Sequence, residues 1–528
     1  MSLDALTAPA IASLIALAAA VVALVRLYVN SRRSIVFDAW VDFAKQEGEG
    51  DRGKSLADLL LFHIREIQNA HQRSGRPLDL TNPYDDIPAF QQELDANLMA
   101  AVELQRETRF VGSVVSLLLA IMPIRPGRLR GSIHRFGDEL RVNVVLEHAR
   151  GRRGTAAPQW TASRTAAEQL PDLIEELAYE IYLGLAQNAV FADAVAFRTY
   201  TEALEAHLRY GDLSEDRDRV KAERLYRKAI KLEPRNPAAH YNLGVLHYYM
   251  FETERNQQAE KAFRAAMPAA RGALRAQVHS GLANVYSTQY HRFKSNDEAD
   301  LEKAIFHAHE ALRLDDGLDV VLKAAAYAHQ QTGQATKDDK KAAEHRRKAV
   351  RYYRKAIAAN PRYYTAHNNL GNLYLVLAQR CEDGRVKRAL LDAAVALFKE
   401  TMTIRPAYQH AYDNVGNAYY ELAFLDEKQR FRLEHAARYF QDALNLVEDY
   451  PEALNDLAML HLTPEWKDRK PDEAPVLHRK ALEACRDQKR QPALAAAYAA
   501  REKAVATGTT VREPGRAVRG ATALAVRA

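Results

Sequence analysis

Two neighbouring stretches, NNLGNLY at residues 368–374 and AVALFKET at residues 394–401, decide the fold. In the second stretch Ala394, Phe398 and Thr401 stand four and three residues apart, which places them on one face of a helix. The leading alanines of successive copies are 37, 45, 45, 45, 42 and 38 residues apart, and a period of this size predicts stacked helical hairpins. The seven copies are Ala222/Tyr226/Ala229, Ala259/Phe263/Ala266, Ala304/Ala308/Ala311, Ala349/Tyr353/Ala356, Ala394/Phe398/Thr401, Ala436/Phe440/Ala443 and Ala474/His478/Ala481.

The first stretch marks the helix that precedes each copy of this pattern. Leu370-Gly371 is followed, three residues after the glycine, by Tyr374. Glycine or alanine lets the two helices of a hairpin approach closely, and we expect the small residues of the second helix to accept the ring of the first. Proline stops a helix, and Pro234, Pro361 and Pro406 close several units. Equivalent pairs with their following residue are Leu243-Gly244 (His247), Leu282-Ala283 (Tyr286), Val415-Gly416 (Tyr419) and Leu457-Ala458 (His461).

Over about Val195 to Val505 these features resemble the tetratricopeptide repeat (TPR) family. The resemblance implies a mainly α fold, a right-handed α-α superhelix of about seven units, whose concave surface binds a peptide or protein partner. The units exceed the ordinary ~34 residues. The excess lies between the two helices of a hairpin, where Arg380–Arg385 indicates a polar loop with helix extensions. The fourth unit, near residues 320–333, lacks the Leu-Gly pair.

Length and composition set the broad class. The chain has 528 residues, 48% of them hydrophobic and 27% charged, which predicts several folded domains with a soluble surface. A net charge of +6 is mild for this length and does not by itself indicate a nucleic-acid partner. Two cysteines, Cys381 and Cys485, exclude a disulfide framework or a cysteine-rich metal site.

The amino terminus contains an apolar segment, Ala5–Val25, without a charged residue. Twenty-one residues at a rise of about 1.5 Å approach the ~30 Å of a bilayer core. Arg26, Arg32 and Arg33 follow it, which predicts a single-pass inner-membrane (plasma-membrane) anchor with the bulk of the chain in the cytoplasm. A cleaved signal peptide and a buried helix are the alternatives. The predicted domains are an anchor with its basic flank at 1–33, an α/β domain at 34–190, the superhelix at 191–505 and a disordered tail at 506–528.

The segment 34–190 alternates strand-like and helix-like patterns, which predicts an α/β domain. A strand is expected over Ile35–Phe43, and helices over Leu56–Ala70, Ala89–Gln105, Leu117–Met122 and Glu168–Gln187. Residues 129–148 predict a hairpin that turns at Gly137-Asp138. Gly131-Ser132, Arg135, Leu140-Arg141-Val142 and Trp160 resemble the amino-terminal α/β domain of TolB and related modules fused to TPR arrays in bacterial proteins, which implies protein contacts rather than catalysis.

One stretch carries the main alternative function. Gly48–Ser55 satisfies the G-x-x-x-x-G-K-[ST] phosphate-loop pattern, in which Lys54 would contact phosphates and Ser55 magnesium. A nucleotide-binding signalling ATPase or GTPase with the repeats as sensor is therefore the alternative. Against it, three carboxylates lie beside the loop and four residues separate it from the strand. No convincing second strand that ends in a magnesium-binding aspartate follows, and Val144–Glu147 is the best available. The other interpretation is a polar glycine-rich loop before a helix.

The asparagines of the repeats are the predicted binding site. Asn242, Asn369 and Asn414 precede the Leu-Gly-like pair by one residue, and Asn284, Asn372 and Asn417 follow it by one; Asn368 adds to the densest part. An amide donates and accepts at once, as a peptide backbone does. The resemblance implies that a peptide lies along these positions in the groove. The other interpretation is that the asparagines satisfy neighbouring helix ends.

Other clusters are weaker functional candidates. Arginines crowd the hairpin at 125–153, and Arg346–Lys355 interleaves basic residues with two tyrosines, which gives an RNA-binding array as a third function class. A charged outer helix face is the simpler interpretation of both. His307, His309 and Glu310 have no third ligand nearby in sequence, so no metal or other cofactor is predicted. The prediction is a non-enzymatic, membrane-anchored scaffold, with nucleic acid an improbable partner and the oligomeric state open.

Overall fold

The computed structural model describes residues 34–38, 40–44, 53–74, 89–91, 127–147, 158–165, 169–185, 190–213, 216–250, 252–292, 297–425, 429–487 and 498–499. The chain divides into two compact units: residues 1–73 and 82–202 belong to the first, and 74–81 and 203–528 to the second. The boundary at Glu202/Ala203 lies within one helix, α6 (Ala194–Leu213).

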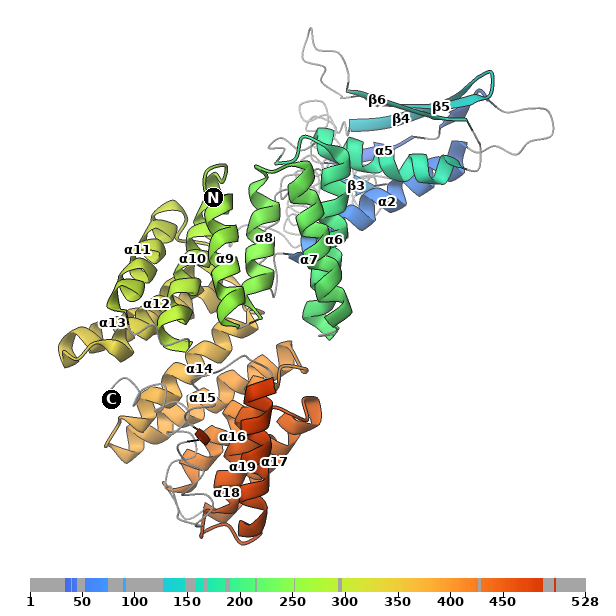
Figure 1. Ribbon diagram of the computed structural model, residues 1–528. Helices are drawn as coiled ribbons and strands as arrows, with labels where there is room; N and C mark the ends of the chain where they lie inside the picture. Colours follow the sequence, from blue (N-terminus) through green and yellow to red (C-terminus); the bar gives the residue numbers. More distant parts are fainter. Residues whose placement is uncertain are drawn as a thin grey trace, which may run out of the picture. The chain divides into compact units, whose positions relative to one another are not determined.

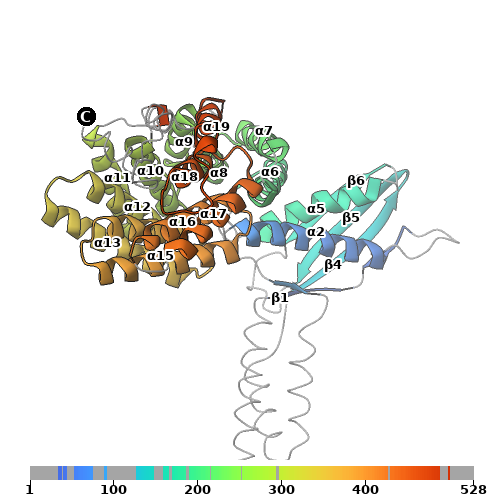
Figure 2. The ribbon, with the colours of Figure 1, turned by 90° about the horizontal axis from the view of Figure 1, so that it is seen from below.

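The first unit contains a six-stranded mixed sheet with helices packed on one side of it (Figures 1 and 2). The strand order is β3-β1-β4-β5-β6, and β2 pairs with β4. β1, β2, β3 and β4 pair in parallel, whereas β4–β5 and β5–β6 are antiparallel. The elements are β1 (Ser34–Phe37), β2 (Val41–Asp42), α2 (Gly53–Ser74), β3 (Ala89–Gln91), β4 (Gly127–Phe136), β5 (Glu139–Glu147), β6 (Gln159–Arg164) and α5 (Leu170–Leu185).

Alternation along β5 shows why the sheet has one covered face. Leu140, Val142, Val144 and Leu146 are buried, while the residues between them are less covered. This period of two is that of a strand with one face toward a core. α2 and α5 supply the other half of that core with side chains that are at most 2% exposed, namely Leu60, Leu61, Ile64, Ile67, Leu173, Ile174, Leu177 and Ile181.

Most sequence predictions for this unit are confirmed, and one is wrong. The hairpin turns at Gly137-Asp138, and Gly137 has a positive φ of 64°, a conformation that glycine adopts without strain. The predicted helix over Ala89–Gln105 begins instead as strand β3, because Ala89–Gln91 pairs in parallel with Ser34–Val36. Tertiary pairing outweighs local helical preference there. Residues 92–105 and Leu117–Met122 lie outside the described part.

The second unit consists of helical hairpins stacked in a superhelical arrangement (Figure 1). With the end of α6 it forms seven hairpins, α6–α7 to α18–α19. The helices are α7 (Asp216–Leu232), α8 (Pro237–Tyr248), α9 (Thr253–Ala266), α10 (Gly272–Arg292), α11 (Glu298–Leu314), α12 (Asp319–Ala335), α13 (Asp339–Ala359), α14 (Tyr364–Gln379), α15 (Gly384–Ile404), α16 (Gln409–Ala423), α17 (Gln429–Leu446), α18 (Pro451–His461) and α19 (Ala474–Asp487).

The recurring pattern of small and core residues forms the buried face of every second helix. All 21 of its residues, from Ala222 to Ala481, are no more than 1% exposed. The seven copies lie on α7, α9, α11, α13, α15, α17 and α19. The longer repeat length comes mainly from helix extension, because α13 and α15 have 21 residues each and only residues 380–383 separate α14 from α15.

The expected contact between an aromatic ring and a small residue exists, but the two helices exchange roles. The ring belongs to the second helix and the small residue to the first. A Cβ at Gly371 would lie 2.5 Å from Cε1 of Phe398, one at Gly416 2.5 Å from Phe440, and one at Gly244 2.7 Å from Phe263. Real Cβ atoms do not come so close, so the ring occupies the space where a side chain would begin.

The tyrosines of the first helices have a different partner. Each receives a hydrogen bond from a cation on the preceding hairpin's second helix. Nη2 of Arg354 lies 2.8 Å from the Tyr374 hydroxyl, and Nη2 of Arg264 lies 2.7 Å from that of Tyr286. Lys399 Nζ lies 3.3 Å from the Tyr419 hydroxyl. These residues tie consecutive hairpins together at their edge.

We predict that Gly371→Ala and Gly416→Ala each destabilise the second unit. Overpacking against Phe398 or Phe440 outweighs the better helix propensity of alanine, for a net loss of about 1–2 kcal/mol. Urea unfolding followed by far-ultraviolet circular dichroism measures the change. Adding Phe398→Leu to Gly371→Ala should recover part of the loss.

Gly384→Ala is the matched control, because no heavy atom lies within 4 Å of a Cβ at that position in the first turn of α15. It should be neutral or slightly stabilising. Equal losses at Gly384 and Gly371 would contradict the seating of the ring.

Candidate functional site

The first helices α8, α10, α12, α14, α16 and α18 form a layer in which each contacts the next; we name it the first-helix layer. Hydrogen bonds cross from one first helix to the next and form a polar seam. Tyr248 bonds Thr288 at 3.2 Å, and Gln379 donates to Glu421 at 3.1 Å. Hydrogen bonds of this kind, which are at least partly shielded from water, fix the lateral register of adjacent repeats.

Several predicted asparagines belong to this seam. Asn414 donates to Oδ1 of Asn368 at 2.9 Å across α14 and α16. Asn417 donates to Oδ2 of Asp456 on α18 at 2.7 Å and to Asp413 within α16. The asparagines that we predicted for peptide binding are therefore, in part, the residues that join the repeats.

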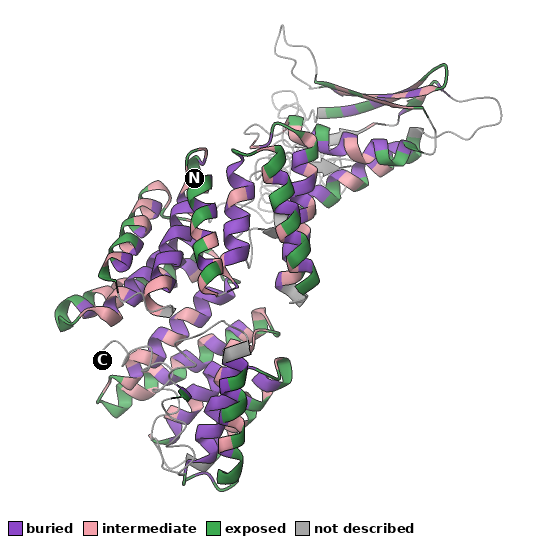
Figure 3. Cartoon of the chain, viewed as in Figure 1, coloured by how far each residue is buried: buried purple, intermediate pink, exposed green. Residues whose placement is uncertain are grey.

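The layer is more covered than an open groove. α8, α12, α14, α16 and α18 contain no exposed residue, and α10 exposes only its first two (Figure 3). Five of the seven predicted asparagines are buried, with exposed fractions of 0–6%: Asn242, Asn284, Asn368, Asn414 and Asn417. Asn369 and Asn372 are half-buried. Use of these residues for peptide binding stays a prediction.

The accessible part of the predicted site lies on α14. Asn369, Asn372 and Val376 are all half-buried and stand at i, i+3 and i+7, which is one helix face. Asn369 forms a side-chain hydrogen bond to the buried Tyr353, whose hydroxyl also donates to Gln330 at 2.8 Å. Asn372 has an oxygen with no hydrogen-bond partner among the described residues.

Unpartnered oxygens recur along the first-helix layer. Among the described residues of these helices, six uncharged side chains have a covered oxygen for which the structure shows no hydrogen-bond partner; their residues are Gln277, Asn284, Thr365, Asn372, Asn417 and Asn455. A buried acceptor without a donor costs about 1–3 kcal/mol, so such atoms mark a function or a missing partner. The sequence analysis missed Gln277, Thr365 and Asn455. Asn455 lies next to Asp456, the residue that precedes the Leu-Gly-like pair in the seventh unit. This position in the sequence could have identified it as a candidate.

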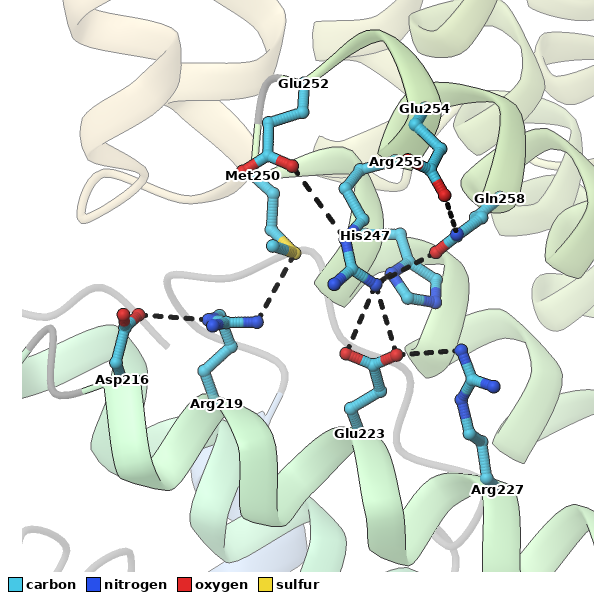
Figure 4. Close-up of polar contacts among 10 residues, drawn as sticks. All are labelled: Asp216, Arg219, Glu223, Arg227, His247, Met250, Glu252, Glu254, Arg255 and Gln258. Atoms are coloured by element: carbon cyan, nitrogen blue, oxygen red, sulfur yellow. Dashed lines mark hydrogen bonds and ion pairs between the residues drawn. The ribbon is translucent and has the colours of Figure 1, made fainter. Parts of the chain in front are cut away.

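A charged network ties the first two hairpins together (Figure 4). Arg255 on α9 donates to Glu223 on α7 at 3.1 and 3.3 Å, and Arg227 donates to the same carboxylate at 2.8 Å. His247 on α8 lies beside Arg255. Burial disfavours the ionised form of Glu223, but His247, Arg255 and Arg227 lower its pKa. The network stabilises the junction of three helices.

Two histidine pairs join the helices of the third and fourth hairpins. Nδ1 of His279 lies 2.9 Å from Nδ1 of His307, and the Nδ1 atoms of His329 and His345 are equally close. One nitrogen of each pair must donate and the other accept, so at least one ring of each pair is neutral. Burial lowers the pKa of His307 to about 4 and that of His329 to about 3. Among the described residues, no group of three or more ligand side chains has the spacing of a metal site.

Some of the described arginines of the hairpin pair with carboxylates. Arg128 and Arg130 pair with Asp38 at 2.9 and 2.8 Å, and Arg130 also pairs with Glu147. Arg141 lies over the ring of Phe136. Glu147 is therefore engaged by an arginine. Arg125, Arg150, Arg152 and Arg153 lie outside the described residues.

The phosphate-loop and membrane predictions fall mostly outside the described residues. Lys54 and Ser55 are exposed in the first turn of α2, whereas residues 48–52 are not described. Nucleotide binding stays a prediction. No helix of the described part has the length and apolar character to cross a membrane, and the predicted anchor at 5–25 is not part of it.

Residues 221–250, which include Glu223, Asn242 and His247, match the family model described as TPR repeat. Stacked helical hairpins with ring-on-glycine packing define a helical-repeat protein, and the matched unit identifies its repeats as TPR. The resemblance of residues 34–190 to the TolB-type domain stays a prediction.

The chain is also similar to solved TPR structures. A thermophilic TPR protein of Thermus thermophilus is 20% identical, with a TM-score of 0.33, and the match covers 43% of this chain and 99% of the other. A TPR protein of Parabacteroides merdae is 14% identical, with a TM-score of 0.34 and coverages of 58% and 99%. PilF of Pseudomonas aeruginosa is 17% identical, with a TM-score of 0.28 and coverages of 46% and 90%. No curated protein matches the chain.

The buried histidines predict acid-induced destabilisation of the second unit. Burial lowers the pKa of His207 and His329 to about 3 in the folded state, against an ordinary value of 6.5. The unfolded chain therefore binds more protons. Stability is full above pH 6.5 and falls as the pH drops from there toward 4, by up to about 1.4 kcal/mol per pH unit for each residue.

Urea unfolding between pH 7 and pH 5 measures this slope. His329→Gln should reduce the slope of unfolding free energy against pH by the contribution of one titrating histidine. Gln334→Ala, at a half-buried position of the same helix, is the control and should leave the slope unchanged because it removes no titratable group. A slope that is the same in His329→Gln and in the unmodified chain would contradict the assignment.

Proposed function

We propose that the protein is a membrane-anchored interaction scaffold whose TPR superhelix binds an extended segment of a partner protein along the first-helix layer. The observation that supports this proposal best is the amide face of α14, where Asn369 and Asn372 are half-buried and the covered oxygen of Asn372 lacks a donor. A peptide backbone presents an N–H group at almost every residue, which is the missing donor. The proposal requires no catalytic residue.

Further unpartnered oxygens on other first helices support a binding site that extends over several repeats rather than one confined to α14. Asn284 on α10 and Asn417 on α16 carry unpartnered oxygens on either side of α14 along the layer. Because α10 and α16 are covered, a partner that begins on α14 reaches them only where adjacent first helices separate. Repeat stacks permit such local opening, since each hairpin contacts only its neighbours.

A peptide selected for the full chain tests this site. We predict that Asn372→Ala weakens the affinity about fivefold or more, because a peptide N–H loses its acceptor. The probe is a labelled peptide obtained by panning a random dodecapeptide library on the full-length protein, and fluorescence anisotropy measures its dissociation constant. The same substitution should change stability by less than about 0.5 kcal/mol.

Asn414→Ala is the matched control. It removes the buried bond to Asn368 and should cost about 1–2 kcal/mol of stability while leaving the peptide affinity of the folded protein unchanged. Selected peptides that bind Asn372→Ala as tightly as the unmodified chain would place the site elsewhere.

The membrane part of the proposal is supported by Ala5–Val25 and the arginines that follow it. We predict that the full chain sediments with membranes and resists washing with alkaline carbonate. An aspartate at the centre of a spanning helix costs about 2.5–3.5 kcal/mol, so Ile15→Asp with Leu17→Asp should release the protein. Leu3→Asp, outside the apolar segment, is the control. Release of the unmodified chain by the same wash would refute the anchor.

A further inference from the structure

The outer surface of α13 carries an unusual surplus of positive charge. Its 21 residues contain eight lysines and arginines but two carboxylates, Asp339 and Glu344. Lys340, Arg347, Arg351 and Lys355 are exposed and lie within one face, since residues four and seven apart share a side of a helix. We name these four residues the α13 stripe. It extends about 22 Å at a rise of about 1.5 Å per residue.

On several other second helices an exposed arginine pairs with a carboxylate one turn away. Arg227 pairs with Glu223 on α7, Arg264 with Glu260 on α9, and Arg313 with Glu310 on α11. On α13, Glu344 pairs with Lys348 at 2.8 Å. None of the four stripe residues has an ion pair with a described residue. The excess of cations is largest on α13, with eight lysines and arginines against two carboxylates, compared with seven against three on α7.

Two further arginines, Arg346 and Arg380, show that the positive charge extends beyond the stripe. Burial and the charge of Arg380 lower the pKa of Arg346 on α13. Arg380 is exposed at the end of α14, so it extends the positive region beyond α13. Holding uncompensated cations together is unfavourable, and an anionic partner relieves the repulsion.

The residues around the stripe favour an acidic polypeptide over a lipid bilayer or a nucleic acid as its partner. Described residues 336–362 contain no exposed large hydrophobic side chain, so the stripe has nothing to insert into a bilayer. Tyr352 offers no platform for a nucleic-acid base, because His329 stacks on its ring at 5.8 Å and Arg351 lies over it at 5.1 Å. A polypeptide with carboxylates at i and i+4 needs neither feature.

We propose that the α13 stripe is a second interaction surface that binds an acidic segment of a partner protein. Cations four residues apart on α13 are about 6 Å apart along the axis, the same interval as carboxylates at i and i+4 of a helical partner. This surface lies on the second helices and does not involve the asparagines of the first-helix layer. It therefore stands independently of the proposed groove.

A labelled helical peptide with glutamate at successive i, i+4 positions is the probe, titrated against the full-length protein at low and physiological salt. We expect saturable binding that weakens as salt rises. The triple variant Arg347→Glu/Arg351→Glu/Lys355→Glu should weaken it about tenfold or more. The neutral triple variant with glutamine at the three positions should give a smaller loss in the same direction.

The matched control is Lys303→Glu/Arg313→Glu/Arg438→Glu, which changes net charge equally at cations that already have carboxylate partners. It should change the affinity less than about twofold, and circular dichroism checks the fold of every variant. The proposal is overturned if the peptide does not bind. It is also overturned if the glutamate triple variant of the stripe and the control triple variant lose the same amount of affinity. A further contradicting result would be that anionic vesicles or an oligoadenylate bind the protein and lose affinity in the stripe variants, whereas the peptide does not.

Discussion

In three of the seven hairpins, an aromatic ring of the second helix packs directly on a glycine of the first, and this contact sets how closely the two helices approach. At Gly371 and Gly416 the ring occupies the volume in which a Cβ would begin, so the two helices approach as closely as backbone and ring allow. Small residues one turn on either side of the ring keep the rest of the crossing flat, as Ala394 and Thr401 do around Phe398. Because each hairpin contacts mainly its neighbours, this local geometry repeats to give the superhelical arrangement.

The polar seam adds what ring packing lacks. Apolar contacts tolerate small sliding of one hairpin over the next, whereas the bond from Asn414 to Asn368, or from Asn417 to Asp456, fixes a single register. The cations that bond Tyr286, Tyr374 and Tyr419 act at the edge of the same junctions. An amide in the seam uses its N–H group for assembly and keeps an oxygen, as Asn417 does, and it is this oxygen that the proposed function assigns to recognition.

Sequence reasoning predicted the helical face well because the determinant is local. Spacings of four and three residues place Ala222 and its equivalents on one side of a helix whatever the tertiary context. The partners of the asparagines were not predictable, because Asn368 and Asn414 are 46 residues apart and their meeting depends on how two hairpins stack. The sense of the ring contact failed for a related reason: spacing within one helix does not say which helix supplies the ring. β3 was mistaken for a helix start because the pairing that forms it involves Ser34–Val36, far away in the chain.

The two proposed surfaces differ in what binding demands of the protein. Among the described residues of the first helices only the first two of α10 are exposed. An extended segment bound to this layer therefore replaces contacts between repeats with contacts to itself, and it binds most readily where the stack is least stable. The α13 stripe is exposed, and binding to it leaves the seam intact, so its affinity responds to ionic strength rather than to repeat stability. A partner with an acidic segment next to an extended one would engage both surfaces of the same repeats. Its second contact would then be intramolecular, which raises the overall affinity without a new interaction at either surface.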